Sequence, residues 1–357
     1  MNKKYISIIF LVILSLILVS CNSQGGEGLT NESDGLIEIT DMADRQHKIP
    51  EKINKIMSTD SVGTIIIYTI NPDKMVGWNY DLKEGEKQYI DEKYHDLPNL
   101  GGAGKSPLNH EELLKIDPDI LVAVGEIDKV NIEKMDDLQE KLNKPVIMLE
   151  SDMNMLAETY EFLGQIMGEE SAKDLAKYCR ETMDNIGKGA KTIKEEDRVT
   201  LYYAEGPNGL ETEPSNSWHG QVIDLIGGKN VAEVEINKDT GKSEINLEQL
   251  ILWNPDLIIS WADERGGYYS GILEDESWKD ISAVKNKKVY EIPNRPFNWF
   301  DRPPSVNRVL GIRWLGNLLY PEIYKYDIRE EVKEFYEMFY HYTLSDQEID
   351  ELLDRSI

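Results

Sequence analysis

The sequence predicts an α/β protein of two lobes, each a mostly parallel sheet flanked by helices, joined by one long connector helix. One reason is that a helix–turn–strand unit occurs twice in the chain. A second is that strand signals alternate with helix signals through short crossovers, which is typical of parallel, helix-covered sheets. A third is residues 158–192, which lack strand signals and carry apolar residues at three- and four-residue spacing. We therefore expect one continuous helix there, with a lobe on either side.

The repeated unit occupies residues 109–122 and again residues 246–259. In each copy an asparagine can cap a short helix, a Pro-Asp turn ends that helix, and a buried apolar strand follows. The matching positions are Asn109/Asn246, Glu111/Glu248, Leu113/Leu250, Pro118/Pro255 and Asp119/Asp256. Two copies at equivalent places indicate a bilobed protein with a two-fold functional surface.

The amino terminus reads as a lipoprotein signal. Lys3 and Lys4 precede an apolar run at residues 5–19, which is short for a membrane span but typical of a secretory signal. Small residues then precede Cys21, in the pattern of a bacterial lipobox. We expect residues 1–20 to be removed, Cys21 to carry lipid and residues 21–35 to form a flexible tether. The alternatives are a signal cleaved elsewhere or a retained anchor helix.

Charge and cysteine content narrow the function further. The formal net charge is −27, which argues against nucleic acid and against electrostatic adhesion to anionic lipid. Membrane attachment would come from acyl chains on Cys21, at the extracytoplasmic face. The only other cysteine is Cys179, which lies on the apolar face of the long helix and is expected in the core. An exported chain without disulfides must be stabilised by its hydrophobic cores, and this chain is long enough to form two of them.

The order of elements divides the chain into a first lobe at 36–155, connector helices at 156–197 and a second lobe at 198–357. The first lobe should open with an edge hairpin, and the remainder of the second lobe after its last strand should be helical. The expected strands are residues 36–39, 48–50, 55–57, 74–77, 120–124 and 145–149 in the first lobe, and 199–203, 257–261 and 288–292 in the second.

Ligands of open parallel sheets bind beyond the carboxyl ends of the strands, so the loops there are the expected binding site. Their aromatic side chains offer rigid apolar area with a polar edge, suited to a bulky planar or chelated ligand, although some could simply pad the lobe interface. Arg302 could hold an anionic group in a fork geometry or make a structural salt bridge, and Arg295 is a weaker candidate. The expected ligand contacts are Ser58, Trp78, Tyr80, Tyr203, Trp218, His219, Trp261, Trp299 and Arg302.

Direct metal binding and catalysis find little support. The five histidines show no paired spacing of a zinc or manganese site, so we predict no resident metal and no cofactor. His219 could touch a ligand, but a hydrogen bond at a helix start is the favoured role. Residues 101–106 superficially resemble a P-loop, yet Pro107 follows instead of a helix, and no Gly-x-Ser-x-Gly elbow exists. We expect a binding protein and not an enzyme, with a surface adhesion or scaffold lipoprotein as the alternative.

Several motifs together resemble a known family. They are the lipobox, the paired Asn-x-Glu-x-Leu units, the Ser217–Gly220 segment followed by residues 227–232, and the segment at 301–305. Over nearly all of residues 36–357 the chain resembles the substrate-binding lipoproteins of ABC importers for iron–siderophore complexes, heme and vitamin B12. The resemblance implies a monomer that captures a metal chelate, first of all an iron–siderophore. Heme, a corrinoid and an oxyanion such as molybdate are the alternatives.

The resemblance also implies a partner. In that family an exposed glutamate on each lobe docks onto arginines of the permease dimer, and Glu111 and Glu248 hold the matching positions. Each would also lie in the first turn of a helix, where a carboxylate gains roughly 0.3–1 kcal/mol from the helix dipole. A long connector should restrict lobe closure, so we expect a largely pre-formed cleft.

Overall fold

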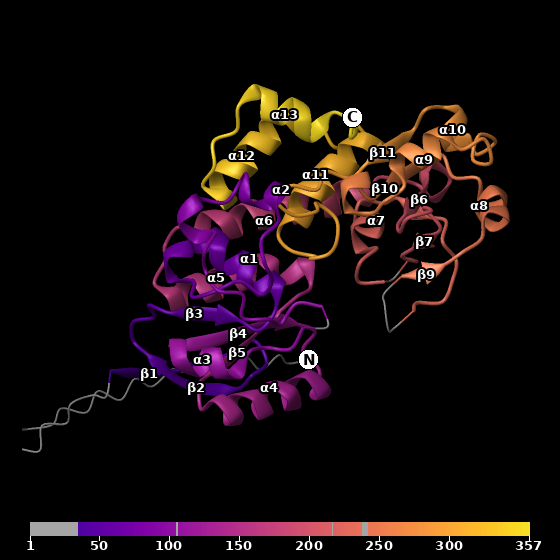
Figure 1. Ribbon diagram of the computed structural model, residues 1–357. Helices are drawn as coiled ribbons and strands as arrows, with labels where there is room; N and C mark the ends of the chain where they lie inside the picture. The colour runs from indigo at the N-terminus through magenta and orange to yellow at the C-terminus, as the bar shows by residue number, and fades with distance from the viewer. Residues whose placement is uncertain (1–34, 105, 216, 238–241) are drawn as a thin grey trace, which may run out of the picture. The chain divides into compact units, whose positions relative to one another are not determined.

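Two short parallel sheets carry the fold in the computed structural model, which describes residues 35–104, 106–215, 217–237 and 242–357 (Figure 1). The first sheet has the order β3-β4-β5 and the second the order β11-β10-β6-β8, and all neighbours within them are parallel. The predicted fold class, two α/β lobes, is confirmed. The strands are β3 (Ile56–Ser58), β4 (Ile120–Gly125), β5 (Val146–Glu150), β6 (Thr200–Ala204), β8 (Lys229–Asn230), β10 (Leu257–Ser260) and β11 (Val289–Glu291).

Two small antiparallel pairs accompany these sheets. The predicted edge hairpin pairs β1 (Leu36–Thr40) with β2 (Gln46–Pro50), and β7 (Glu211–Thr212) pairs with β9 (Ser243–Glu244). Helices fill the crossovers and the carboxyl-terminal part. They are α1 (Ser61–Ile70), α2 (Glu84–Lys87), α3 (His110–Ile116), α4 (Lys129–Leu142), α5 (Leu156–Met167), α6 (Ala172–Ala190), α7 (Gln221–Leu225), α8 (Leu247–Trp253), α9 (Tyr269–Glu274), α10 (Ser282–Lys285), α11 (Asn307–Leu319), α12 (Ile328–Tyr340) and α13 (Asp346–Leu353).

The helix of each repeated unit begins at its predicted cap. The Asn109 side chain accepts a hydrogen bond from Glu112 N at 3.1 Å, and Asn246 accepts one from Gln249 N at 2.8 Å. These bonds satisfy backbone donors that a helix start otherwise leaves unpaired. Both helices also end alike, each on a left-handed residue just before the Pro-Asp pair. The sequence repeat is therefore a structural repeat.

The aspartate of each Pro-Asp pair ties its unit to the neighbouring strand. Asp119 Oδ2 accepts from Asn54 N at 2.6 Å and from Lys55 N at 2.9 Å, immediately before β3. Asp256 Oδ2 accepts from Thr200 N at 3.2 Å and from Thr200 Oγ1 at 2.7 Å, at the start of β6. In both lobes the turn thus fixes where the adjacent parallel strand begins.

The connector differs from the single helix expected over residues 158–192. Helix α5 ends at Gly168, whose φ of 71° is left-handed, and the chain turns back so that α6 packs against α5. The turn is tight, because a Cβ on Gly164 would lie 2.2 Å from the Cβ of Ala172. The prediction of a continuous helix is wrong, and α6, with 19 residues, is the longest helix in the part of the chain that the structure describes.

The strand expected at residues 74–77 is also absent from the described residues. A 3-10 turn at Pro72–Lys74 occupies its start, and proline cannot donate to a strand ladder. Beyond the turn the chain makes only single bridges, between Met75 and Ile56 and between Trp78 and Asn99.

A shared helical core connects the two halves of Leu36–Ile357, which form one compact unit. Helix α12, late in the chain, packs on α1 of the first lobe, where the rings of Tyr340 and Tyr68 lie 6.2 Å apart. The predicted domain boundaries did not anticipate this return. Cys179 is fully buried in the same core, as predicted, and burial raises the pKa of its thiol.

The predicted signal peptide, Cys21 and nearly all of the predicted tether lie outside the described residues. Among the residues that are described, no helix is both long enough and apolar enough to cross a membrane.

The strand-tethering role of Asp119 can be tested by substitution. Asp119→Ala removes an acceptor shared by two backbone donors, so we expect the free energy of unfolding to fall by about 1–3 kcal/mol. Asp119→Asn keeps one side-chain oxygen and should lose clearly less. Urea unfolding measures both variants. Equal losses in the two variants would show that the hydrogen bonds are not what the carboxylate contributes.

Candidate ligand-binding site

A cavity of about 1030 Å³ lies where the carboxyl ends of β4 and β5 face the start of α7. Its volume is at the upper end of small-molecule sites, enough for a bulky ligand. It lies where the carboxyl ends of parallel strands are expected to place a ligand. The lining residues are Val124, Gly125, Glu126, Ile127, Glu150, Ser151, Asp152, Met155, Ser217, Trp218, Gln221, Asp224 and Leu225.

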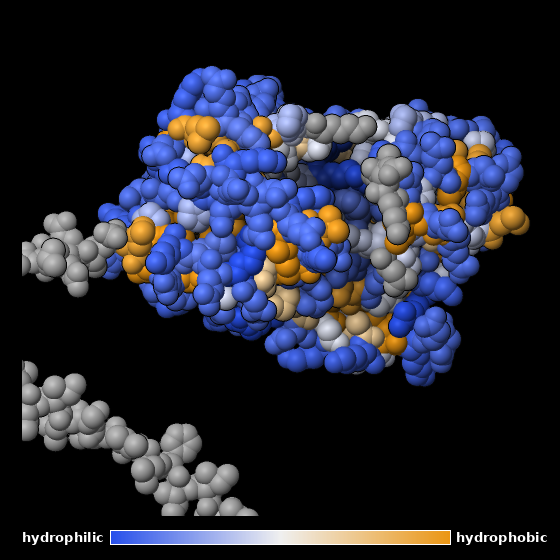
Figure 2. Space-filling view, turned by 90° about the horizontal axis from the view of Figure 1, so that it is seen from below, coloured by the Kyte–Doolittle hydropathy of each residue, from blue (hydrophilic) through white to orange (hydrophobic). Residues whose placement is uncertain are grey.

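The lining of this cavity is negatively charged. It includes Glu126, Glu150, Asp152 and Asp224, and no lysine or arginine occurs among the described residues that line it. Trp218, with an exposed fraction of 40%, and Met155 add apolar surface. Figure 2 shows a predominantly hydrophilic surface with scattered apolar patches. A wall of one sign concentrates ions of the opposite sign, so the cavity favours a ligand that is neutral or positively charged.

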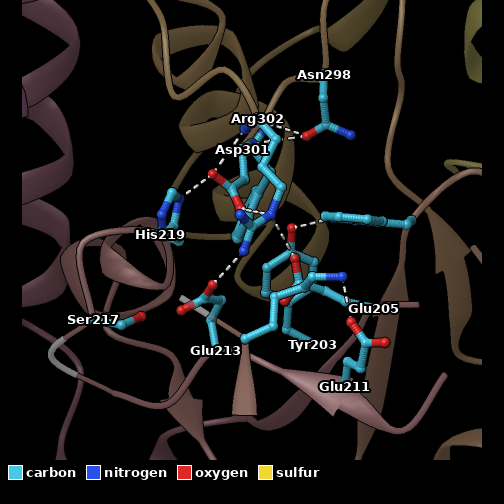
Figure 3. Close-up of polar contacts among 12 residues, drawn as sticks. Tyr203, Glu205, Glu211, Glu213, Ser217, His219, Asn298, Asp301 and Arg302 are labelled. Carbon is cyan, nitrogen blue, oxygen red and sulfur yellow. Dashed lines mark hydrogen bonds and ion pairs between the residues drawn. The ribbon is translucent and has the colours of Figure 1, made fainter. Parts of the chain in front are cut away.

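A cluster of buried acids adjoins this region in the second lobe (Figure 3). The guanidinium of Arg302 lies 2.7 Å from Glu213 Oε1, 3.1 Å from Asp301 Oδ2 and 3.5 Å from Glu205 Oε1. The three carboxylate side chains have no exposed surface, whereas 26% of the Arg302 side chain is exposed. We call these four residues the Arg302 cluster. They support the salt-bridge interpretation of Arg302 over simple capture of an anion.

His219, in the loop before α7, lies beside the Arg302 cluster and contacts it through Asp301. Its Nδ1 makes a short hydrogen bond to Asp301 Oδ1, and α7 begins without a side-chain cap; in the preceding turn Ser217 Oγ accepts from Gly220 N. The expected role of His219 is thus corrected. His219, Glu213 and Asp301 each offer a ligand atom, and the three atoms lie within 4.8 Å of one another. Sequence spacing could not show this grouping, because the three residues come from separate segments.

Burial changes the charge balance of the cluster. Desolvation, with the nearby Asp301 carboxylate, raises the pKa of Glu205 well above its ordinary value. Desolvation raises the pKa of Glu213 to about 7, although the charge of His219 opposes the shift. Burial alone would lower the pKa of Arg302, but the carboxylates of Asp301 and Glu205 outweigh it and raise the pKa. The acids are therefore held in a site that penalises their negative charge.

Trp261 and Tyr80 keep part of their surface exposed at the expected loops. Trp261 Nε1 donates to the Tyr203 hydroxyl at 2.6 Å, and the Arg302 guanidinium lies 5.5 Å from the Trp261 ring centre. The hydroxyl of Tyr80 lies 3.4 Å from Glu86 Oε1, and burial raises the pKa of Tyr80. With Trp218, His219 and Arg302, these two remain candidate ligand contacts.

Four predicted contacts are buried in structural positions instead. Trp78 is 2% exposed and its indole N–H donates to Tyr94 O, while Ser58 Oγ donates to Val122 O. Tyr203 is fully buried beneath Trp261, and Trp299 is fully buried in the core. Burial of all four side chains corrects their assignment as ligand contacts; Ser58 and Tyr203 belong to strands β3 and β6 rather than to loops.

Arg295, the weaker candidate, pairs with Glu264 at 2.7 Å, so the observed role of its side chain is a salt bridge. The glycine-rich segment after residue 100 also has a packing role. Gly102 has a φ of 97°, and a Cβ there would lie 2.3 Å from Thr59 O. This close approach accounts for the glycine without a phosphate.

The residues that sequence reasoning missed are Glu205 and Glu213, with Asp301 named only as part of a motif. Glu205 directly follows β6, so its place at the carboxyl end of a strand was a usable signal. Glu213 follows the two-residue strand β7, which had no recognisable pattern.

Two α/β lobes with a cavity at the carboxyl ends of the strands are the architecture of a substrate-binding protein. The chain belongs to the periplasmic binding protein family, whose model matches residues 58–296. It is of the class III type that serves ABC importers, and it binds a small ligand for a permease and is not an enzyme.

Three similar proteins illustrate the range of the family. The "Molybdate-binding protein MolA" of Haemophilus influenzae is 25% identical over an alignment of 334 residues that covers 85% of this chain and 90% of that protein. The "High-affinity heme uptake system protein IsdE" of Staphylococcus aureus is 23% identical over 301 residues, covering 82% and 90% of the two chains. The solved ABC transporter solute binding protein of Sulfurospirillum deleyianum is 31% identical with a TM-score of 0.82, covering 89% of this chain and 99% of that one.

The raised pKa of Glu213 gives a test of the cluster. Its native-state pKa of about 7 lies above the ordinary 4.5, so the native state holds an extra proton between these values. Its contribution to stability is therefore present at low pH and lost as pH rises toward 7. In metal-free protein, the unfolding free energy of the wild type should fall relative to that of Glu213→Gln between about pH 5 and pH 8. Parallel urea-unfolding profiles would contradict the proposed environment.

Proposed function

We propose that this protein is a lipoprotein, anchored through lipid on Cys21, that captures a chelated metal of the iron–siderophore class. It passes the complex to an ABC permease dimer at the extracytoplasmic face of the membrane. The observation that supports the ligand class is the carboxylate lining of the cavity, from Glu126, Glu150, Asp152 and Asp224.

The charge of the cavity narrows the kind of chelate. A negatively charged complex would lose hydration and meet four carboxylates of the same sign. A neutral or positively charged complex meets no such barrier, and the exposed Trp218 ring offers it an apolar face. The proposal therefore favours ferric hydroxamates over ferric catecholates, and it disfavours heme because of its propionate groups.

An oxyanion is the second candidate ligand. Arg302 is partly exposed, and the Nε and Nη1 atoms of the buried Arg308 have no hydrogen-bond partner among the described residues. A relative named as molybdate-binding adds to this candidate. Against it, an oxyanion would have to compete with Glu205, Glu213 and Asp301 for the Arg302 guanidinium.

A thermal-shift screen of the purified mature protein separates these ligands. A bound ligand at a hundredfold excess over its dissociation constant stabilises the native state by about 2.7 kcal/mol. We expect a neutral or cationic ferric hydroxamate to raise the melting temperature and molybdate to leave it unchanged. The iron-free hydroxamate is the control for the chelator alone. A shift with molybdate and none with any ferric complex would favour the oxyanion; no shift with any small molecule would favour an adhesion or scaffold role.

The proposed permease contacts are Glu111 and Glu248. The Glu111 side chain is 82% exposed and pairs only with Lys115 of its own helix among the ion pairs described, at 3.0 Å. Glu248 is exposed at the same place in α8. A permease built from two subunits needs one acidic anchor on each lobe, and the matched caps of α3 and α8 present the two glutamates in the same way.

Charge reversal tests this contact. The double variant Glu111→Lys/Glu248→Lys should keep its affinity for the ligand found in the screen, because both residues lie outside the cavity lining. Uptake of that ligand by cells carrying the importer should fall at least about tenfold. The reason is that each introduced lysine would repel the permease arginines that the glutamate is proposed to attract. The matched control reverses the exposed Glu140 and Glu322. Unchanged uptake, or a loss of ligand affinity, would reject the docking assignment.

A further inference from the structure

Two buried carboxylate oxygens beside His219 have hydrogen-bonding capacity that no donor among the described residues uses. Glu213 Oε2 and Asp301 Oδ2 are buried and accept no hydrogen bond from the described residues, although Asp301 Oδ2 lies 3.1 Å from Arg302 Nε. Buried polar atoms are normally satisfied, and a carboxylate oxygen without a donor is costly. These two oxygens point to a positively charged group that binds here.

We propose that Glu213, His219 and Asp301 form an open coordination site for a divalent transition metal. Their ligand atoms lie within 4.8 Å of one another, so the shifts needed to bring all three into contact with one ion are small. The metal would lie between His219 Nδ1 and the Asp301 carboxylate, where the short hydrogen bond now runs. The inference goes beyond the proposed function, because a divalent ion is a different ligand from a ferric chelate.

The charge of the Arg302 cluster fits a divalent ion. Once all three buried carboxyl groups are ionised, a dication together with the Arg302 guanidinium would bring the group to neutrality. Lys242 does not change this balance, since it pairs with Glu211. Arg302 would remain as a fixed counter-charge, held to Glu213 on one side and to Asp301 on the other.

The donor types and the exposure specify the class of ligand. One imidazole and two carboxylates suit nickel, cobalt, zinc or ferrous iron and do not suit soft cuprous copper. Three protein ligands leave coordination positions open, as in sites that bind water or substrate. The His219 side chain is 20% exposed, and Trp218 before it lines the cavity. The site therefore takes a metal whose own chelator or waters leave positions free, rather than a fully enclosed ion.

Metal binding alone tests the inference. Full-length mature protein, freed of metal with a chelator, is titrated with nickel chloride and zinc chloride by calorimetry. We expect one ion per chain. Because loss of an outer-shell partner typically costs 10–100-fold in metal affinity, removal of a direct ligand in His219→Ala should weaken binding by at least about a hundredfold. His110→Ala, at an exposed histidine, should bind as the wild type does.

A second variant keeps the test decisive if His219→Ala fails to fold. Glu213→Gln is isosteric and removes one ligand charge, so it should also lose nickel and zinc binding while far-ultraviolet circular dichroism stays unchanged. The inference is overturned if the wild type binds neither ion, or if a folded variant binds as tightly as the wild type. If a ferric hydroxamate still stabilises the wild type in that event, the proposed function stands and only the metal site falls.

Discussion

The ion pairs between Arg302 and three buried carboxylates are the interaction on which the ligand-facing side of the second lobe depends. Arg302 adopts a φ of 56°, which residues other than glycine rarely do, and its guanidinium is held by Glu205, Glu213 and Asp301. Asp301 in turn orients His219. A single guanidinium cannot neutralise three ionised carboxylates in a desolvated site, so the pKa values of Glu205 and Glu213 are raised and their protonated forms are favoured.

The two lobes that carry this cluster are coupled by their core. Helix α12 comes from the end of the chain yet packs on α1 of the first lobe, and the largest apolar cluster includes residues of both sheets. Closing the lobes by a wide hinge swing would break this packing. The shared core therefore favours a cleft that is largely formed before the ligand arrives.

Much of the architecture was predictable because local chemistry sets it. The Asn109 and Asn246 caps, the Pro-Asp turns and the apolar strands after them appear where the sequence placed them. The break at Gly168 was missed because a glycine can lie within a helix or end it, and the apolar spacing resumes at Ala172. The ligand-binding site was harder to predict than the fold. Trp78 and Trp299 are of a residue type that often contacts ligands, but both pack inward. Glu213, His219 and Asp301 are apart in the sequence and are brought together by the fold.

In the proposed metal site, side chains of the second lobe contact the metal directly. The X-ray absorption spectrum at the nickel K-edge of the nickel-loaded protein tests this most directly. Coordination by Glu213, His219 and Asp301 predicts one imidazole nitrogen and a shell of oxygen donors that includes carboxylates, with the imidazole signal lost in His219→Ala. A shell of oxygen donors without imidazole in the wild type, or an imidazole signal that survives in His219→Ala, would contradict it.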